Sequence, residues 1–331
     1  MKIQIRLFSS LAFLLLFACQ IPNGTGLTPR TSTPSFTPTV TATLTLPPTL
    51  TVTPTPAPPA RRVLILSIDG LRPDAIQLAP MQNLMTLMEN GAYTLSARTI
   101  YPSATLPAHT SMLSGLCPSK HGVNWNDYIP ENGYANVIDI FDIAHAAGLQ
   151  TVMYVGKEKL RQITEPSSTD VFEYINDRDL VIIEKLTSNF PADFRLMFIH
   201  FPTTDWMGHE YGWLSSEQLS VLFRADQALG NLLAELDARG LREETLIIVT
   251  ADHGGHDTTH GSSLPEDMTI PWIAAGAGIQ PLQLSTQVQT VDTAATAAFA
   301  LGLTFPAEWD GVPVYEAFGL PAEKQSQTCT K

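Results

Sequence analysis

Short runs of almost continuously apolar residues limit the folds that this 331-residue chain can adopt. The strongest lie at residues 62–68, 195–201 and 245–250, and β-branched residues are frequent in them. Such a run is typical of a central parallel strand, because helices cover both faces of a parallel sheet. Between the runs lie amphipathic segments that stop at glycine, as residues 216–239 do before Gly240. The alternation predicts an α/β fold, with a mostly parallel sheet and helices on both faces.

The same patterns predict further elements along the chain. We expect helices at residues 81–89, 137–147, 179–187 and 291–301. We expect further strands at residues 93–100, 151–155 and 270–275. In such sheets ligands bind beyond the carboxyl ends of the strands, so any active site is predicted there.

The first 19 residues have the pattern of a secretion signal. Lys2 and Arg6 precede an apolar run at residues 11–17, which is too short for a span that stays in the bilayer. Residues 16–19, Leu-Phe-Ala-Cys, resemble a bacterial lipoprotein cleavage site, which implies a lipid on Cys19. An ordinary secretory signal is the alternative. Either way we expect a protein outside the cytoplasm, attached to a membrane only through a lipid anchor.

Residues 20–60 form a segment of very different composition. Residues 21–60 contain 13 Thr and 10 Pro, no acidic residue, and Arg30 as the single basic one. Such a segment has little with which to build a core, so it is predicted to be a disordered stalk. Residues 61–331 are long enough for a single domain with a full core.

The charge of this domain excludes some partners. It holds all 32 acidic residues and 16 of the 19 basic residues, which gives a formal charge of −16 with neutral histidine. Such a field disfavours nucleic-acid polymers and anionic lipid surfaces. A small phosphate ester remains a possible substrate, because bound divalent metals invert the field locally.

Acidic and imidazole side chains follow three of the predicted strands. Asp69 follows the first, Asp205 and His209 follow the second, and Asp252 and His253 follow the third. An aspartate after a strand is usually a turn residue. Together, however, carboxylate and imidazole suit zinc, manganese or a similar divalent ion. Two such ions about 4 Å apart could hold the attacking and leaving oxygens of a displacement at phosphorus.

Thr105 is the candidate nucleophile. It lies between a predicted strand and a helical run that stops at Gly115, so we expect it at or near a helix N-terminus. By itself this pattern favours a helix cap with Pro107 in the first turn. The aspartates and histidines at the strand ends favour a second interpretation, in which a metal ion lowers the pKa of the Thr105 hydroxyl.

Five ordered motifs resemble the alkaline phosphatase superfamily and, within it, the type I phosphodiesterase/nucleotide pyrophosphatase family. They are Asp69-Gly70, Pro-Ser-Ala-Thr-Leu-Pro at 102–107, His121-Gly122-Val123 with Asn126, Asp205-x3-His209, and Asp252-His253-Gly254. The resemblance spans roughly residues 63–314. It implies an alkaline-phosphatase-like fold for residues 61–331 and a metal-dependent phosphoric ester hydrolase.

The resemblance also implies roles for the residues around Thr105. Thr105 would be the nucleophile and would share one metal with Asp69, Asp252 and His253. Asn126 and the Thr105 backbone N–H would bind the oxygen on phosphorus that gains charge in the transition state.

A second metal is implied for Asp205, His209 and a later histidine. His256 and His260 are the two candidates. We choose His260, because His-Gly before a strand resembles compact members of the superfamily. The two ions are expected to be zinc, with manganese as the alternative.

The surroundings of Thr105 bear on the substrate. Relatives that cleave nucleotides often have an aromatic residue and an asparagine where this chain has Leu106 and Ala108, which weakens a prediction of nucleotide stacking. Arg72 and Lys120 are the only basic residues in the motifs expected around phosphorus. We therefore expect a phosphodiester or pyrophosphate substrate. Phosphonate hydrolase, phosphomonoesterase, phosphotransferase and a catalytically spent binding module remain alternatives.

Other noticeable residues are expected to serve structure rather than chemistry. They are His109, His121, Trp125, Tyr128 and Asp226. Trp125 and Tyr128 are expected to be buried, and a place in the wall of a substrate pocket near Asn126 is the alternative. Outside the cytoplasm Cys117 and Cys329 are free to form a disulfide, but the sequence does not show whether they meet.

Overall fold

The computed structural model describes residues 58–321, 326 and 328–329. The predicted signal segment, the lipid-bearing Cys19 and nearly all of the predicted stalk lie outside these residues. The described residues belong to one compact unit, residues 55–331. Within it, none of the described helices combines the length and the apolar composition needed to cross a bilayer.

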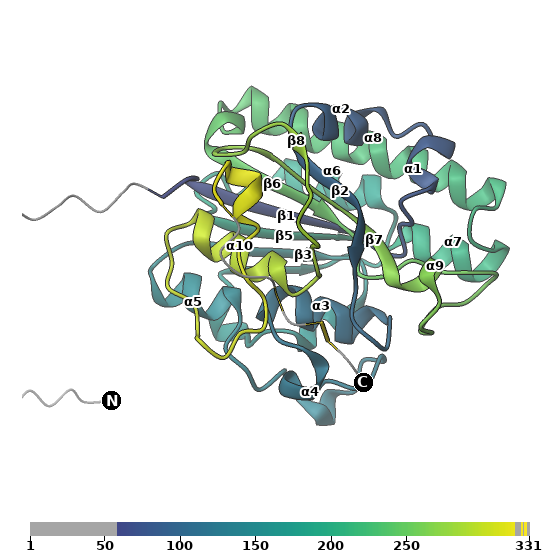
Figure 1. The fold of residues 1–331 in the computed structure, drawn as a ribbon, viewed down its shortest axis with the longest axis horizontal. Helices are drawn as coiled ribbons and strands as arrows, with labels where there is room; N and C mark the ends of the chain where they lie inside the picture. Colours follow the sequence, from purple (N-terminus) through teal and green to yellow (C-terminus); the bar gives the residue numbers. More distant parts are fainter. Residues whose placement is uncertain (1–57, 322–325, 327, 330–331) are drawn as a thin grey trace, which may run out of the picture. The chain divides into compact units, whose positions relative to one another are not determined.

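A single sheet of eight strands forms the centre of this unit (Figure 1). Its order is β4-β3-β5-β1-β6-β7-β2-β8. The strands are β1 (Arg62–Ile68), β2 (Ala92–Arg98), β3 (Thr151–Val155), β4 (Val171–Tyr174), β5 (Leu196–Phe201), β6 (Thr245–Thr250), β7 (Thr269–Gly276) and β8 (Leu282–Gln283).

The strands predicted from continuous apolar runs lie in the middle of the sheet. Every residue of β1, β5 and β6 is buried, as expected for strands covered on both faces. β1 pairs in parallel with both β5 and β6, and β3 continues the parallel arrangement beyond β5. β7 is antiparallel to its neighbours β6 and β2, so the sheet is mixed but mostly parallel, as predicted. β4 and β8 were not predicted, because they have four and two residues and no long apolar run.

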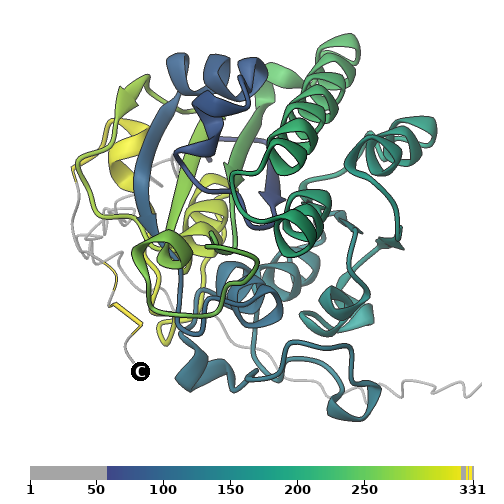
Figure 2. The same cartoon turned by 90° about the vertical axis from the view of Figure 1, so that its right-hand side faces the viewer.

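Helices cover both faces of the sheet (Figures 1 and 2). One layer contains α8, which packs against α1, α2, α6 and α7, and the other contains α3, α5 and α10, which contact one another. The helices are α1 (Ala75–Leu78), α2 (Gln82–Glu89), α3 (Thr105–Ser114), α4 (Pro118–His121), α5 (Ile140–Ala146), α6 (Asp179–Ser188), α7 (Thr203–Tyr211), α8 (Ser216–Ala238), α9 (Pro265–Met268) and α10 (Asp292–Ala300). Short 3-10 helices are η1 (Pro130–Asn132), η2 (Glu158–Gln162), η3 (Pro166–Ser168), η4 (Arg242–Glu244) and η5 (Tyr315–Phe318).

The long helix α8 shows how the sequence sets these boundaries. The Ser215 hydroxyl accepts the N–H of Gln218 and caps the first turn. On the buried face, the Asp226 carboxylate accepts the backbone N–H groups of Asn83 and Leu84 in the first turn of α2. Asp226 therefore has the structural role predicted for it, because it satisfies donors that the helix itself leaves free.

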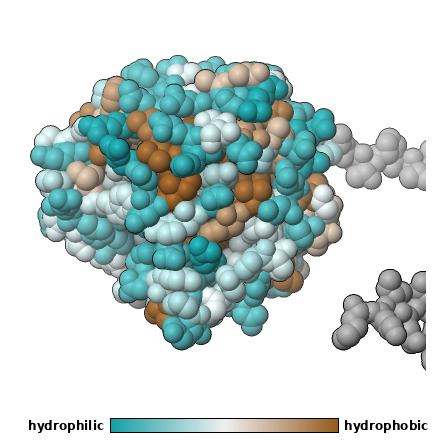
Figure 3. Space-filling view, turned by 180° about the vertical axis from the view of Figure 1, so that it is seen from behind, coloured by the Kyte–Doolittle hydropathy of each residue, from teal (hydrophilic) through white to brown (hydrophobic). Residues whose placement is uncertain are grey.

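A disulfide joins Cys117 to Cys329. Cys117 lies just beyond the end of α3, and Cys329 lies close to the C-terminus of the chain. The bond thus answers the question that the sequence left open, and it fixes the C-terminal tail beside the helix that begins with Thr105. On the face opposite that of Figure 1, hydrophobic residues reach the surface in separate patches among hydrophilic ones (Figure 3).

Candidate metal centre and nucleophile

The carboxyl ends of neighbouring parallel strands bring the predicted ligands together. β5, β1 and β6 lie side by side, so the segments that follow them meet at one edge of the sheet. Asp69 follows β1, and Asp252 and His253 follow β6. Asp205 and His209 lie on α7, which begins two residues after β5.

α7 was not among the predicted helices, although it carries two of the predicted ligands. Asp205 and His209 are four residues apart, so the helix presents both on one face. The Asp-x3-His spacing itself indicates a helix, because residues four apart lie on the same face of one. His209 Nδ1 lies 2.9 Å from the carbonyl oxygen of Thr258, which can only accept, so Nδ1 carries the proton. His209 Nε2 is then free to bind a metal, and it lies 3.4 Å from Asp205 Oδ1.

Asp69, Asp252 and His253 form a fully buried cluster in which one atom of each residue has no hydrogen-bond partner among the described residues. His253 Nδ1 bonds the Gly254 carbonyl at 2.7 Å, which leaves Nε2 unprotonated. Asp252 Oδ1 accepts the N–H of Gly70, which leaves Oδ2 free. His253 Nε2 lies 3.4 Å from Asp69 Oδ1 and 3.3 Å from Asp252 Oδ2.

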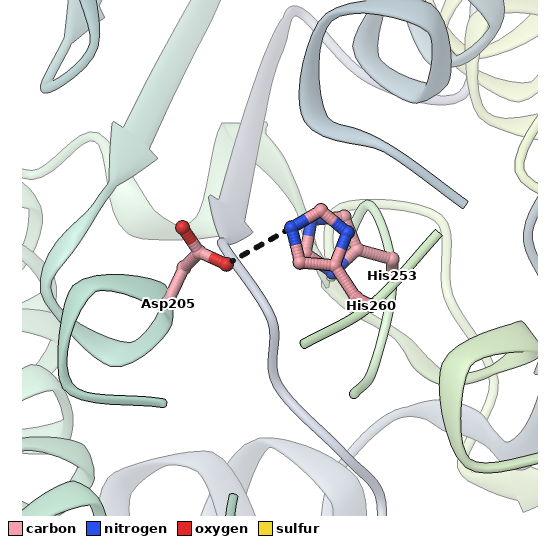
Figure 4. Close-up of side chains that lie close together, drawn as sticks. All are labelled: Asp205, His253 and His260. Atoms are coloured by element: carbon pink, nitrogen blue, oxygen red, sulfur yellow. Dashed lines mark ion pairs between the residues drawn. The ribbon is translucent and has the colours of Figure 1, made fainter. Parts of the chain in front are cut away.

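A second cluster forms around Asp205 Oδ1, which is also buried without a partner. His260 Nε2 lies 3.5 Å from it, while His260 Nδ1 bonds the Ser103 carbonyl at 2.8 Å. Figure 4 shows the Asp205 carboxylate pointing toward His260, whose ring is stacked on that of His253. The ring centroids are 3.7 Å apart, so the two clusters lie next to each other.

The spacings within both clusters fit metal ligands. Metal–ligand bonds of about 2.0–2.2 Å in a tetrahedral site place the ligand atoms about 3.3–3.6 Å from one another. The separations of 3.3 to 3.5 Å in the two clusters fall in this range. Buried polar atoms are costly without a partner, so unpartnered atoms converging at this spacing favour a bound cation.

The two candidates for the last ligand lie in different surroundings. His260 faces Asp205. His256 instead points to the carboxylate of Asp267, with Nδ1 2.7 Å from Oδ1. His256 is therefore not brought into either cluster.

Thr105 is the first residue of α3, as the sequence indicated, but it is not the cap. Ala104 occupies the N-cap position, so the Thr105 side chain is not used to satisfy the helix. Thr105 is only 1% exposed. The next N–H, that of Leu106, donates to Asn126 Oδ1 at 2.9 Å. Because the amide oxygen is occupied in this way, the Asn126 NH₂ group remains available as a donor beside Thr105.

Lys157 is a residue of the site that the sequence analysis missed. It follows β3 and is 9% exposed. Its Nζ lies 2.6 Å from Asp69 Oδ2, 2.5 Å from Asp205 Oδ2 and 3.4 Å from Thr105 Oγ1. The expectation that no further basic residue surrounds the reacting atoms is therefore wrong. The only available signal was a Gly-Lys pair directly after a predicted strand.

The two basic residues that were considered lie elsewhere. Arg72 binds the Asp74 carboxylate and the carbonyl oxygen of Gly255. Lys120 binds Asp310 and the carbonyl oxygen of Glu308, 188 residues away along the chain. Both are held by other partners. The argument for a phosphodiester rested on a lack of cations around phosphorus, and it is Lys157 that removes its basis.

Burial and charge act in opposite directions on the ionisable groups here. Burial alone would raise the pKa of Asp69, but Lys157 and the hydrogen bond from His200 hold it well below its usual range. Burial alone would lower the pKa of Lys157, but Asp69 and Asp205 raise it above its usual value. Burial, and to a smaller extent the charge of the neighbouring His253, lowers the pKa of His260 to about 4. Near neutral pH His260 is therefore neutral, which is the form that binds metals.

His109 and His200 lie behind the candidate ligands. His109 Nδ1 lies 2.8 Å from the Thr105 carbonyl oxygen, and its Nε2 lies 2.8 Å from the Ser67 hydroxyl. His200 Nε2 lies 2.8 Å from Asp69 Oδ2. His109 thus forms hydrogen bonds, as expected, whereas His200 had not been singled out because it lies inside a buried strand.

An open pocket of about 400 Å³ adjoins Asp205 and Lys157. Tyr128, Tyr174 and Trp206 contribute aromatic side chains to its walls. Tyr128 is 38% exposed, so of the two expectations for it, the pocket wall and not the buried core describes its place. Trp125 is part-buried, and its Nε1 donates to Gln162, as expected for a structural residue.

Two solved structures have a fold similar to that of this chain. Murine ectonucleotide pyrophosphatase/phosphodiesterase 5, as an inactive variant in complex with AMP, matches with a TM-score of 0.66 and 16% identity, over 78% of this chain and 98% of that chain. Wild-type alkaline phosphatase PafA matches with a TM-score of 0.66 and 13% identity, over 81% of this chain and 100% of that chain. The predicted alkaline-phosphatase-like α/β fold is confirmed.

The family model of type I phosphodiesterase / nucleotide pyrophosphatase matches residues 63–147 and 154–281. The chain belongs to this family, as the motifs predicted. A relative from Schizosaccharomyces pombe, the uncharacterized pyrophosphatase/phosphodiesterase C725.05c, is 24% identical over 58% of this chain and 44% of its own length. The match covers less than half the length of such curated relatives.

Proposed function

We propose that the protein hydrolyses phosphate esters through a phosphorylated Thr105. The observation that carries the proposal is the set of buried, unpartnered ligand atoms that converge beside this residue: Asp69 Oδ1, Asp205 Oδ1, Asp252 Oδ2 and His253 Nε2. Membership in a phosphodiesterase family supports the same chemistry. The intact set of ligand atoms argues against a catalytically spent binding module.

Two divalent ions fit these atoms, and we propose zinc before manganese because imidazole and carboxylate are mixed. Asp69, Asp252 and His253 would hold one ion together with Thr105 Oγ1. The second would be held by Asp205, His209 and His260. When bound, the ions would supply positive charge that favours ionisation of the Thr105 hydroxyl and stabilises the oxygens on phosphorus.

The residues of the chain would then act in two half-reactions. In the first, a bond forms between Thr105 Oγ1 and phosphorus while the bond from phosphorus to the leaving oxygen breaks. The hydroxyl proton of Thr105 passes to water, and the leaving oxygen takes a proton from water. In the second, water attacks phosphorus, the Oγ1–P bond breaks and the hydroxyl is restored. In both, the Asn126 NH₂ group and the N-terminus of α3 stabilise negative charge on a phosphoryl oxygen.

The test compares Thr105→Ala with Thr105→Ser, which keeps a hydroxyl. Thr105→Ala should lower kcat for p-nitrophenyl esters of phosphate by about 10³-fold or more, as loss of a nucleophile does. Thr105→Ser should retain a measurable rate, and acid quenching during turnover should trap one phosphoryl group on residue 105. A near-normal rate in Thr105→Ala, with an unchanged melting temperature, would rule out the covalent route.

We further propose that the mature protein is held outside the cytoplasm by a lipid on Cys19. The lipoprotein-like sequence at residues 16–19 supports this placement, as do relatives named ectonucleotide pyrophosphatase/phosphodiesterase. Acyl labelling should mark the wild type and should disappear in Cys19→Ala. An unlabelled wild type found in the medium would leave only ordinary secretion.

A further inference from the structure

The Lys157 ammonium group is held rigidly at the candidate site by its backbone and by its partners. Gly156 packs so closely on Pro202 that an added Cβ would lie 2.3 Å from the proline ring, so only glycine fits there. This contact holds the end of β3 against the segment that follows β5. Lys157 is thereby fixed opposite Asp69 and Asp205, and it does not project into solvent.

The hydrogen-bonding capacity of Lys157 is only partly used. An ammonium group has three donors. Two of them are directed at Asp69 Oδ2 and Asp205 Oδ2, at 2.6 and 2.5 Å. The third donor points toward Thr105 Oγ1, whose distance of 3.4 Å from Lys157 Nζ is long for a hydrogen bond. The third donor is thus aimed at the place where a phosphoryl group attached to Thr105 would lie.

The lysine does not compete with the proposed metal ligands. In both aspartates Lys157 contacts Oδ2, whereas the unpartnered atom is Oδ1. Each carboxylate therefore has one oxygen for Lys157 and one for a metal ion. Lys157 can keep its place when both candidate metal sites are filled.

A second lysine, Lys159, stands nearby. Lys159 lines the open pocket beside Lys157, is half-buried, and makes no hydrogen bond or ion pair with any described residue. Burial, and to a smaller extent repulsion from Lys157, lowers the pKa of Lys159. An ammonium group in such a position gains from an anionic ligand, because the carboxylates of Asp69, Asp205 and Asp127 offset only part of the cost of its burial.

From this arrangement, and resting on the proposed function, we propose that Lys157 binds the third free oxygen of a phosphate monoester, with Lys159 adding positive charge at the pocket. The preferred substrate is then a dianionic monoester rather than a diester. A diester would place an uncharged ester oxygen and its substituent against Lys157. It would lose a hydrogen bond between charged groups, which corresponds to a difference of about 10- to 100-fold.

The experiment uses two substrates that share one leaving group. p-Nitrophenyl phosphate and methyl p-nitrophenyl phosphate differ only in the methyl group that removes one charge. The zinc-loaded wild type should have the higher kcat/KM on the monoester. Lys157→Met, which keeps much of the side-chain volume, should lower monoester kcat/KM by about 10- to 100-fold and diester kcat/KM by less than about threefold. Lys159→Met should act in the same direction with a smaller effect.

The control is Lys185→Met, because Lys185 is exposed on α6 and its side chain has no described partner. This variant should leave both substrates unchanged. Metal content is measured for every variant and should stay at that of the wild type. Equal losses of monoester and diester hydrolysis in Lys157→Met, or a wild type that prefers the diester, would overturn the proposal.

The failure of this proposal can be told apart from the failure of the proposed function. If the metal-loaded wild type hydrolyses neither substrate, the proposed function is wrong, and binding decides the role of Lys157. Calorimetry near pH 8 would then compare inorganic phosphate, which is mainly a dianion, with dimethyl phosphate, a monoanion. Weaker binding of phosphate alone in Lys157→Met would support the charge preference, whereas unchanged binding would contradict it.

Discussion

His200 Nε2 and Asp69 Oδ2 lie 2.8 Å apart in the fully buried centre of the sheet. The backbone N–H of Gly156 points at His200 Nδ1 at 3.2 Å, so Nδ1 is the acceptor and Nε2 carries the proton. His200 therefore donates to Asp69. This bond and the one from Lys157 both engage Oδ2, and together they orient the carboxylate with Oδ1 toward His253.

The first prediction is that His200 tunes metal affinity without touching the metal. His200→Leu should weaken zinc binding by about 10- to 100-fold, the usual cost of removing a partner behind a ligand. His200→Gln keeps a donor near the position of Nε2 and should restore much of the affinity. Competition with a chelator of known affinity measures the effect without relying on turnover. Equal zinc affinity in wild type and His200→Leu would contradict the orienting role.

The fold was largely predictable because its central strands carry unambiguous patterns. β1, β5 and β6 are almost continuously apolar, as strands buried on both faces are. The antiparallel direction of β7 was not predictable. Its residues are as apolar as those of its neighbour β6, which runs parallel to β1, and only the long-range path of the chain sets its direction.

The candidate site was predictable where ligands follow such strands, as Asp69 and Asp252 do. Lys157 was not found, because a lysine after a strand normally lies in solvent and nothing local shows that β3 ends beside Asp205. His200 was missed because it lies within β5, where every residue is buried, and nothing in the sequence separates it from the core residues around it. Both are defined by neighbours more than 40 residues away along the chain.

The second prediction concerns removal of metal. The unpartnered ligand atoms are satisfied only when a cation is bound, so binding should stabilise the folded state by linkage. At a free ion concentration about 1,000 times Kd this corresponds to about 4 kcal/mol. A domain of this size should then melt on the order of 10 °C lower after treatment with a chelator. Scanning calorimetry before chelation, after it, and after zinc is restored checks the effect. Asp252→Asn, which removes a ligand of one ion only, should show a smaller shift on chelation.

The third prediction is a pH dependence that originates away from the metal centre. Asp292 begins α10 and accepts the N–H groups of Gln289 and Val312, but burial raises its pKa to about 6. In the folded state it therefore keeps a proton that the unfolded chain has already lost. Its contribution to stability is present below about pH 4 and is lost as the pH rises through 6, by up to about 1.4 kcal/mol per pH unit.

Urea unfolding at several values between pH 4 and 7 tests this sign. Other carboxylates titrate in the same range, so the quantity to follow is the difference between the wild type and Asp292→Asn. Relative to the wild type, Asp292→Asn should become more stable as the pH rises. A difference that stays constant across this range would show that Asp292 is ionised in the folded protein throughout.

The fourth prediction concerns the disulfide. Cys117 and Cys329 are 212 residues apart, so their bond closes a long loop and restricts the unfolded chain. Cys329→Ser should lower the free energy of unfolding by about 2–4 kcal/mol. The hydrogen bonds from Gln289 and Ser326 that hold the tail near Asp292 should weaken as well. Chemical denaturation of Cys329→Ser and of the reduced wild type should give the same loss, and an unchanged midpoint in both would contradict a stabilising role.

The last prediction separates Arg72 from Lys157 as the source of any preference for monoesters. Arg72 is close to Asp69 in sequence, but its guanidinium group is taken up by the Asp74 carboxylate and the Gly255 carbonyl oxygen. An exposed ion pair of this kind contributes about 1 kcal/mol or less. Arg72→Ala should therefore change p-nitrophenyl phosphate kcat/KM by less than about threefold, since Lys157 is unaffected. If Arg72→Ala instead abolished monoester hydrolysis while the diester rate survived, Arg72 would have to leave Asp74 to bind substrate, and Lys157 would serve only to hold the two aspartates together.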